Sequence, residues 1–541
     1  MSSTGAPFPK RHRLRFYRSK TGCLTCRRRR KKCDESVPCN ACVSRELECV
    51  WPEIQLNRDT AGILSNSPSS SPSTGPNPPR SLHNCAIADQ EASELTNEDL
   101  ALISRAKSNS SLNTDGLVTS NALTPPTLPG KVASWQLRTL SASPFRPEAM
   151  PPTSQLILHY YLQEGAAKLS PKPMQSNPFI TQVLPRAACD ETLMHAVLAL
   201  GGALLDLKYD KSNPILQTAW GHYAQVLGDL RHTFQNLSTN PCRQYLRLLL
   251  ILVILAHAEA ISGNSQGSIF SHLRASRQLM LKFISEGRDK GTAGDKAIEG
   301  FVLELYAYLA LVANITPYAL DDQRTIPLDP VLLSLGFLQD YEDFGAVLSC
   351  GPSLFEKIAT ISVLARQRLS EDATMGQCSI ESIQMYQGLL QELLCWTSPP
   401  PSSDTENYVV AHRCTGETYR YSLLVYLKSS MYGASVKDNP EILLEIQGHI
   451  NIVWQFLPTV LASPFGSIIL WPSMILGSCL TNPAQRNDLC SFLRAPRWHL
   501  RVTEACITML KLLWEDPDDR AYGPFGLYLV MKKHGINFCM V

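Results

Sequence analysis

Residues 21–49 read TGCLTCRRRRKKCDESVPCNACVSRELEC and place six cysteines within 27 positions. The spacing is C-x2-C-x6-C, then five residues, then C-x2-C-x6-C again, so the two halves of the stretch repeat one pattern. A CxxC pair brings two thiolates within reach of one tetrahedral zinc ion. The other eleven cysteines are spread over 514 residues, so this density is not typical of the whole chain. The spacing therefore predicts a metal site.

The number of sulfurs indicates how many metal ions this site holds. Each half supplies three sulfurs, whereas a closed structural zinc site takes four ligands. One zinc ion would leave two thiols over, but two zinc ions that share two of the six thiolates use every cysteine. Such a core carries a net negative charge, which the basic run Arg27–Lys32 offsets. The expected ligands of the two Zn²⁺ ions are Cys23, Cys26, Cys33, Cys39, Cys42 and Cys49.

The distribution of charge indicates what this module binds. The net charge of the chain is only +2, yet residues 1–52 hold thirteen basic and four acidic residues. Between Lys10 and Cys33 there are twelve basic residues and no acidic one. A basic amino-terminal end on a mildly acidic body indicates a polyanionic partner such as nucleic acid. The arm at residues 10–20, KRHRLRFYRSK, fits backbone contacts or a nuclear import signal, and a solvated basic tail is the alternative.

Two other interpretations of the cysteines are open at this point. One is a zinc-held module without a nucleic-acid role, which leaves the basic run unexplained. The other is a set of disulfides, which are typical of oxidising compartments. The first 35 residues contain no apolar segment of the kind found in secretory signals, so we expect an intracellular chain and favour metal ligation.

The stretch resembles the six-cysteine binuclear zinc cluster of fungal transcription factors. The segments CLTCRRRRKKC, DESVP and CNACVSRELEC match the first half, the proline-containing loop and the second half of that family's pattern. In the family the first cysteine of each half bridges the two metals, so the resemblance implies that Cys23 and Cys39 bridge. It further implies that the remaining thiolates complete one zinc site each, as the pairs Cys26 with Cys33 and Cys42 with Cys49.

The resemblance also implies how the module binds DNA. A helix that starts near Cys26 would spread the basic run around its surface and direct its carboxyl end into the major groove. In the family this end reads a CGG triplet. The matching positions are Arg29 and Arg30, of which the second is usually lysine in the family; arginine contacts guanine O6 and N7 bidentately. The expected phosphate contacts, which position the module without specifying sequence, are Arg27, Arg28, Lys31 and Lys32.

The composition changes after the cysteine stretch. Residues 65–79 contain only Ser, Pro, Thr, Gly and Asn, which predicts a flexible linker. Within the linker, Asn97–Lys107 is a candidate helix capped by Thr96. The five acids between Asp89 and Asp99 fit either an activation helix or a solvated linker helix. Residues 51–64 show no sustained heptads, so either the helical body forms a homodimer or the protein binds DNA as a monomer.

The rest of the chain has a helical hydrophobic period. Apolar residues recur at helical spacing in the segments 191–207, 242–260, 267–283 and 503–514, and strand-like alternation is scarce. Prolines predict breaks near residues 171–173, 214, 241, 327–330, 399–401 and 517. The longest apolar run, Leu248–Ala256, has nine residues, whereas a membrane-spanning helix needs about 20. We therefore expect a buried helix there and no membrane partner.

The helical body resembles the regulatory domain of the same fungal factors. The resemblance rests on residues 155–185, 193–205, 354–369 and 522–536, and implies an all-helical domain that restrains or transmits activation. The body lacks HExxH, P-loop and dinucleotide-binding motifs. Its histidines beside apolar faces, His195, His222, His257 and His272, are expected to be core residues rather than catalysts. The expected core tryptophans are Trp220, Trp396, Trp454, Trp471 and Trp514.

The sequence thus predicts a small zinc-cluster DNA-binding module of two short helices and a large all-α regulatory domain, joined by a disordered linker. The expected domains are a basic arm at 1–20, the binuclear zinc cluster at 21–52, the linker at 53–150 and the helical domain at 151–541. We predict a nuclear, sequence-specific regulator of RNA polymerase II genes that is not an enzyme. Its expected partners are double-stranded DNA with CGG-type half-sites and the transcription machinery. The alternatives are a zinc-held adaptor and an enzyme with a zinc-cluster targeting module.

Overall fold

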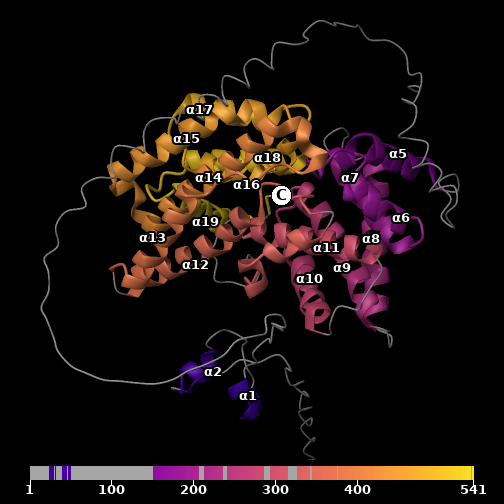
Figure 1. Cartoon of the computed structure of the whole chain (residues 1–541), viewed down its shortest axis with the longest axis horizontal. Coiled ribbons are helices and arrows are strands. Elements are labelled where there is room, and N and C mark those ends of the chain that lie inside the picture. The colour runs from indigo at the N-terminus through magenta and orange to yellow at the C-terminus, as the bar shows by residue number, and fades with distance from the viewer. Residues whose placement is uncertain are drawn as a thin grey trace, which may run out of the picture. The chain divides into compact units, whose positions relative to one another are not determined.

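The computed structural model of the chain divides into two units, Met1–Cys85 and Ala86–Val541 (Figure 1). It describes residues 24–29, 31, 39–45, 47–49, 150–205, 213–235, 241–285, 293–314, 326–341, 344–374, 376–537 and 539–540. The basic arm, the candidate helix Asn97–Lys107 and all of the predicted linker before Met150 lie outside these ranges. The described residues are largely helical and contain no β-strand, apart from one isolated bridge between Gln266 and Asn537. The predicted all-α class is confirmed.

The first unit contains the two short helices that the sequence predicts. Helix α1 spans Leu24–Arg28 and helix α2 spans Asn40–Val43. The buried side chains in the described part of this unit are those of Cys26, Cys39 and Cys42. Three cysteines cannot supply the apolar core that a small domain needs, so the described part of the unit depends on another source of stability.

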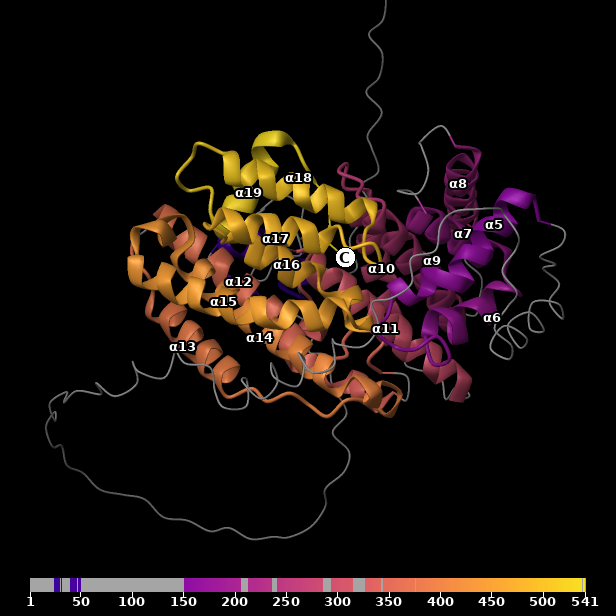
Figure 2. The same ribbon diagram turned by 90° about the horizontal axis from the view of Figure 1, so that it is seen from above.

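The second unit is built from two groups of helices. The first group comprises α5 (Pro152–Tyr160), α6 (Leu184–Ala187), α7 (Glu191–Leu205), α8 (Pro214–Gln235), α9 (Pro241–Ile261), α10 (Ser268–Ser285) and α11 (Ala293–Ala313). The second group comprises α12 (Pro352–Thr374), α13 (Ile380–Leu394), α14 (Val409–Tyr432), α15 (Pro440–Leu461), α16 (Leu470–Ser478), α17 (Pro483–Leu493), α18 (Arg501–Glu515) and α19 (Gly523–His534). Figure 2 shows α5–α9 on one side of this unit and α12–α19 on the other.

Short helical turns connect these elements. Two are π-helical, at Tyr161–Gly165 and Phe179–Val183. The others are 3-10 turns at Ala166–Lys168, Pro330–Leu333, Gly336–Asp340, Ser403–Tyr408, Gly433–Asp438 and Pro464–Ile468. Contacts between α11 and α12 and between α9 and α18 join the two groups of helices.

The helices coincide with the periodic segments of the sequence. The predicted segments 191–207, 242–260, 267–283 and 503–514 correspond to α7, α9, α10 and α18. Pro214 and Pro241 are breaks because each is the first residue of a helix, where proline has no hydrogen bond to lose. Pro458 was not a predicted break, and it lies in the last turn of α15.

Helix α9 forms the centre of the first group and packs against α7, α10 and α11. Every residue of its apolar run Leu248–Ala256 is buried. Among the described residues, the segment Gln244–Ile261 is long and apolar enough to cross a membrane by length and composition, and 83% of it is buried inside the unit. This burial is typical of a core helix, as the sequence predicts.

Aromatic side chains form much of the core of the second group. The Trp471 ring is fully buried, with the rings of Tyr419 and Tyr426 centred 6.2 Å and 5.7 Å away. Trp396, Trp454 and Trp514 are partly buried against the core. The prediction for Trp220 is wrong, because this side chain is 42% exposed on the outer face of α8.

The four histidines occupy two kinds of position. His257 and His272 are buried, as predicted, and burial lowers the pKa of His257 to about 3. His222 is half-buried; its Nε2 lies 2.8 Å from Ser154 Oγ, and its Nδ1 lies 2.8 Å from Nδ1 of His195. Burial and the neighbouring His195 lower the pKa of His222 to about 4. Both shifted rings are therefore neutral at pH 7.

Candidate metal centre and nucleic-acid interface

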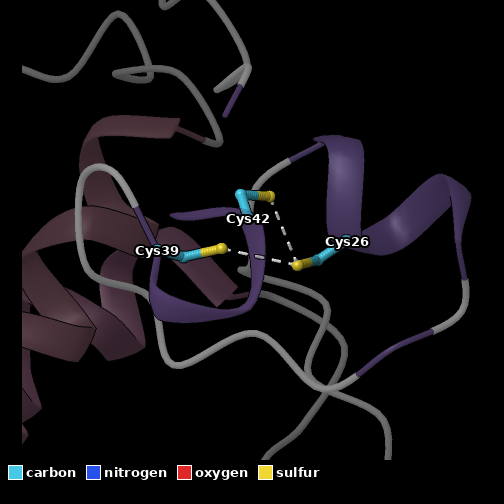
Figure 3. Close-up of side chains that lie close together, drawn as sticks. All are labelled: Cys26, Cys39 and Cys42. Carbon is cyan, nitrogen blue, oxygen red and sulfur yellow. Dashed lines mark hydrogen bonds between the residues drawn. The ribbon is translucent and has the colours of Figure 1, made fainter. Parts of the chain in front are cut away.

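Three thiols from both halves of the cysteine pattern meet in the first unit (Figure 3). Cys26 lies in α1, Cys39 is the residue before α2, and Cys42 lies within α2. The Sγ atom of Cys26 is 3.4 Å from Sγ of Cys39 and 3.8 Å from Sγ of Cys42. All three side chains are buried, and their sulfurs lie within 4.8 Å of one another. The two halves of the pattern therefore form one site.

Backbone contacts hold the second half of the pattern around this site. The backbone N–H of Cys42 and that of Val43 donate to the carbonyl of Cys39, at 2.9 Å and 3.0 Å. The backbone N–H of Cys39 points at the Sγ atom of Cys49, 3.2 Å away. Thr25 Oγ1 of α1 donates to the carbonyl of Glu48 at 2.7 Å. The return of the chain at 47–49 thus contacts both short helices.

The spacing of the sulfurs fits shared metal ions. Thiolates on one tetrahedral zinc, with Zn–S bonds of about 2.3 Å, lie roughly 3.8 Å apart. The separations of 3.4 Å and 3.8 Å are close to this value. They are well above the length of a disulfide bond, about 2.05 Å. Buried thiols at this spacing suit zinc, a metal that prefers soft sulfur ligands.

The structure places some of the predicted site residues and not others. It brings Cys26, Cys39 and Cys42 together, with Cys49 beside Cys39. Of the basic run, Arg28 and Lys31 are exposed and Arg29 is half-buried. The predicted site residues that lie outside the described part of the chain, in whole or for their side chain, are Cys23, Arg27, Arg30, Lys32 and Cys33.

The helix expected to start near Cys26 and carry the whole basic run differs in the structure. Helix α1 begins at Leu24 and ends at Arg28. The backbone N–H of Lys31 donates to the carbonyl of Cys26 at 3.1 Å, and that of Arg29 donates to Thr25 at 3.2 Å. A bond from the sixth residue back to the first closes a helix end and turns the chain away.

Comparison with known families identifies the class to which these features belong. Residues 21–59 match the fungal Zn(2)-Cys(6) binuclear cluster domain, a domain that holds two zinc ions. Residues 156–541 match the fungal specific transcription factor domain, which covers most of the chain. The chain therefore belongs to the family of fungal zinc cluster transcription factors that carry this helical domain.

Individual relatives match over a short part of the chain. The transcription factor lfc1 of Flammulina velutipes is 44% identical over 66 residues, which is 12% of this chain and 24% of that protein. The zinc cluster transcription factor CZF1 of Candida albicans (strain SC5314 / ATCC MYA-2876) is 42% identical over 52 residues, which is 9% of this chain and 12% of that protein. The match thus spans about a quarter or less of the length of these relatives. No solved structure matches the chain.

Proposed function

We propose that this protein is a sequence-specific, zinc-dependent regulator of RNA polymerase II genes that acts in the nucleus. The observation that carries the proposal is the juxtaposition of buried thiols from both halves of the pattern with exposed cations at the end of α1. Family membership supports the same function. The adaptor and the enzyme with a targeting module are not favoured by any contact in the described residues.

The zinc ligands of this proposal are the six cysteines of the pattern. Cys39 bridges the two metals: it belongs to the second half, yet its sulfur lies 3.4 Å from Cys26 of the first half. Cys23 bridges in the equivalent position of the first half. Cys26 with Cys33 and Cys42 with Cys49 complete the two sites. Bound zinc supplies structural cross-links and takes part in no reaction.

The basic run divides into two roles in this proposal. Arg29 and Arg30 follow the end of α1 and read a CGG-type triplet, because arginine can donate two hydrogen bonds to one guanine. Arg27, Arg28, Lys31 and Lys32 contact phosphates. A homodimer would contact two such half-sites.

The remaining parts of the chain have distinct tasks in the proposal. Residues 1–20 are the basic arm, 21–52 the zinc cluster and 53–150 the linker. Residues 151–541 form the helical domain, which regulates activity through the transcription machinery and catalyses no reaction.

The division of roles within the basic run is testable by two matched variants. Arg30→Ala is expected to relax specificity within the triplet and to weaken binding to the preferred duplex by about 1–3 kcal/mol. Arg27→Ala is expected to weaken binding to all duplexes alike. It should also reduce the slope of log K against log salt concentration by about 1, the effect of losing one phosphate contact. Titrations of duplexes that differ at each triplet position, at several salt concentrations, measure both effects. If the two variants change the ranking of the duplexes in the same way, the assignment of roles is wrong.

A further inference from the structure

Helix α8 carries large apolar side chains on the face that points away from its own unit. Trp220, Leu227 and Phe234 are 42%, 39% and 38% exposed. They are spaced seven residues apart, so they lie along one line on the helix. The opposite face of α8 is already used, since it packs against α5 and α7. An ordinary surface helix needs only one apolar face, so the second one requires an explanation.

The residues between these three complete a coiled-coil seam. Gln217, Ala224 and Arg231 are exposed and alternate with Trp220, Leu227 and Phe234 at steps of three and four residues. Steps of three and four give the 3.5-residue repeat by which one helix packs along another. The seam extends from residue 217 to residue 234, almost the full length of α8. Its occupant is therefore expected to be another helix.

We propose that α8 is the contact surface of a homodimer, in which α8 of a second copy packs antiparallel against it. In a two-fold contact every pair of facing residues occurs twice. If residue i of the first copy contacts residue j of the second, then residue j of the first copy contacts residue i of the second. With the two-fold axis between Ala224 and Leu227, the small Ala224 faces Leu227 of the second copy. In the same register Trp220 faces Arg231, and Gln217 faces Phe234. Large side chains then oppose small or flexible ones in every layer.

The charge on the seam also favours a second copy. Arg231 is the only charged residue of the six that form the seam. In the antiparallel register its guanidinium lies opposite the exposed Trp220 ring, and arginine over an indole is a favourable cation–π pair. Because of the two-fold symmetry, this pair forms twice. A parallel arrangement would instead bring the two Arg231 side chains together.

Two glycines beside the seam fit the same arrangement. A Cβ atom added at Gly221 or Gly228 would meet no atom of the described residues within 4 Å, so packing among these residues does not require glycine at either position. Glycine inside a helix costs about 1 kcal/mol relative to alanine. In the antiparallel register Gly221 of one copy lies close to Gly228 of the other. The absence of side chains there lets the two backbones approach closely.

A groove at the amino-terminal half of α8 offers a place for the end of the second helix. Its volume is about 700 Å³, and its lining includes Gln217, Trp220, the loop 262–266 and Arg501. The register places Phe234 of the second copy opposite Gln217, at this groove. The exposed ring of Phe234, at one end of α8, thus packs in the groove at the other end of α8 of the second copy. This arrangement assigns a contact surface to the homodimer of the proposed function, and it rests on the formation of that homodimer.

The inference is tested by sedimentation velocity of the full chain without DNA, over a range of micromolar concentrations. We expect the wild-type chain to be a dimer. Leu227→Glu should raise the dimer dissociation constant by at least about 30-fold, the effect of losing a central interface residue. The matched control is Leu444→Glu, which alters a side chain 76% exposed on α15 and should leave the dimer intact.

A mixture of two variants tests the register. Ala224→Lys and Leu227→Glu should each be monomeric alone, because each places two like charges near the two-fold axis. Mixed together they should form a heterodimer, in which the introduced lysine of one copy meets the introduced glutamate of the other. A monomeric wild type, such as would result if residues 86–107 of the same chain covered α8, overturns the proposal. A dimer that resists Leu227→Glu overturns it equally. Neither result bears on zinc or DNA binding, since the measurement contains no DNA.

Discussion

Replacement of Cys39 by alanine is expected to abolish the folding of the zinc module and, with it, sequence-specific DNA binding. Cys39 lies where the two halves of the pattern meet, with its sulfur 3.4 Å from that of Cys26 and its backbone N–H on the sulfur of Cys49. The described part of this unit buries only cysteines, so that part keeps no apolar core when the metals are lost. Folding free energy in such modules is metal-binding free energy, of about 10–16 kcal/mol for structural zinc.

Native mass spectrometry measures the zinc content of this variant, and duplex titration measures its binding. The expected result is loss of both zinc ions and of all preference among duplexes. Cys395→Ala is the matched control, because Cys395 is an exposed cysteine after α13 and outside the zinc module. Loss of a single zinc from Cys39→Ala would contradict the assignment of Cys39 as a bridging ligand.

Replacement of Trp471 by alanine is expected to cause the largest loss of stability in the helical unit. Trp471 is the largest fully buried side chain of the described residues and packs between Tyr419 and Tyr426. Truncation of a buried tryptophan to alanine costs about 3–5 kcal/mol, because the apolar contacts are lost and a cavity remains. This cost is a large fraction of the free energy of unfolding of a typical domain, about 5–15 kcal/mol.

Urea unfolding followed by far-ultraviolet circular dichroism measures this effect, because the helical unit supplies most of the signal. Trp471→Phe is the matched control. The indole N–H of Trp471 has no hydrogen-bond partner among the described residues, so phenylalanine loses volume but no hydrogen bond. Phenylalanine should therefore be less destabilising than alanine. If the free energy of unfolding of Trp471→Ala lies within about 1 kcal/mol of the wild-type value, the assignment of Trp471 to the core is wrong.

The sequence predicted the presence of the zinc module better than it predicted the local geometry of the module. Cysteine spacing reports ligand count directly, because a tetrahedral metal fixes how many sulfurs must converge. It does not report where a helix ends, and α1 stops at Arg28 rather than continuing through the basic run. The bond from Lys31 to Cys26 that closes α1 depends on backbone conformation, for which six consecutive cations give no signal. The hydrogen bond from Thr25 to the carbonyl of Glu48 likewise joins two residues that no sequence pattern predicts to be in contact.

In the helical body, too, sequence patterns predict the helices but not the long-range contacts between residues. Periodic apolar residues predicted α7, α9, α10 and α18, because long amphipathic or apolar segments have few alternatives to a helix. Glu304 was not singled out, although its buried carboxylate accepts the backbone N–H groups of Gly345, Val347 and Leu348. These partners lie more than 40 residues away, and a long-range contact of this kind leaves no local signature. The exposure of Trp220 was missed because residue type predicts burial only on average.

Binding selection from random duplex DNA shows whether the protein recognises DNA sequence and whether this recognition requires zinc. The full chain is incubated with the duplex pool with zinc and after removal of zinc by a chelator, and the retained duplexes are sequenced. Duplexes that contain CGG triplets are expected to be enriched with zinc, and this enrichment is expected to be lost without zinc. Salt-sensitive binding with no sequence preference, or an enrichment that persists after zinc is removed, would contradict this expectation.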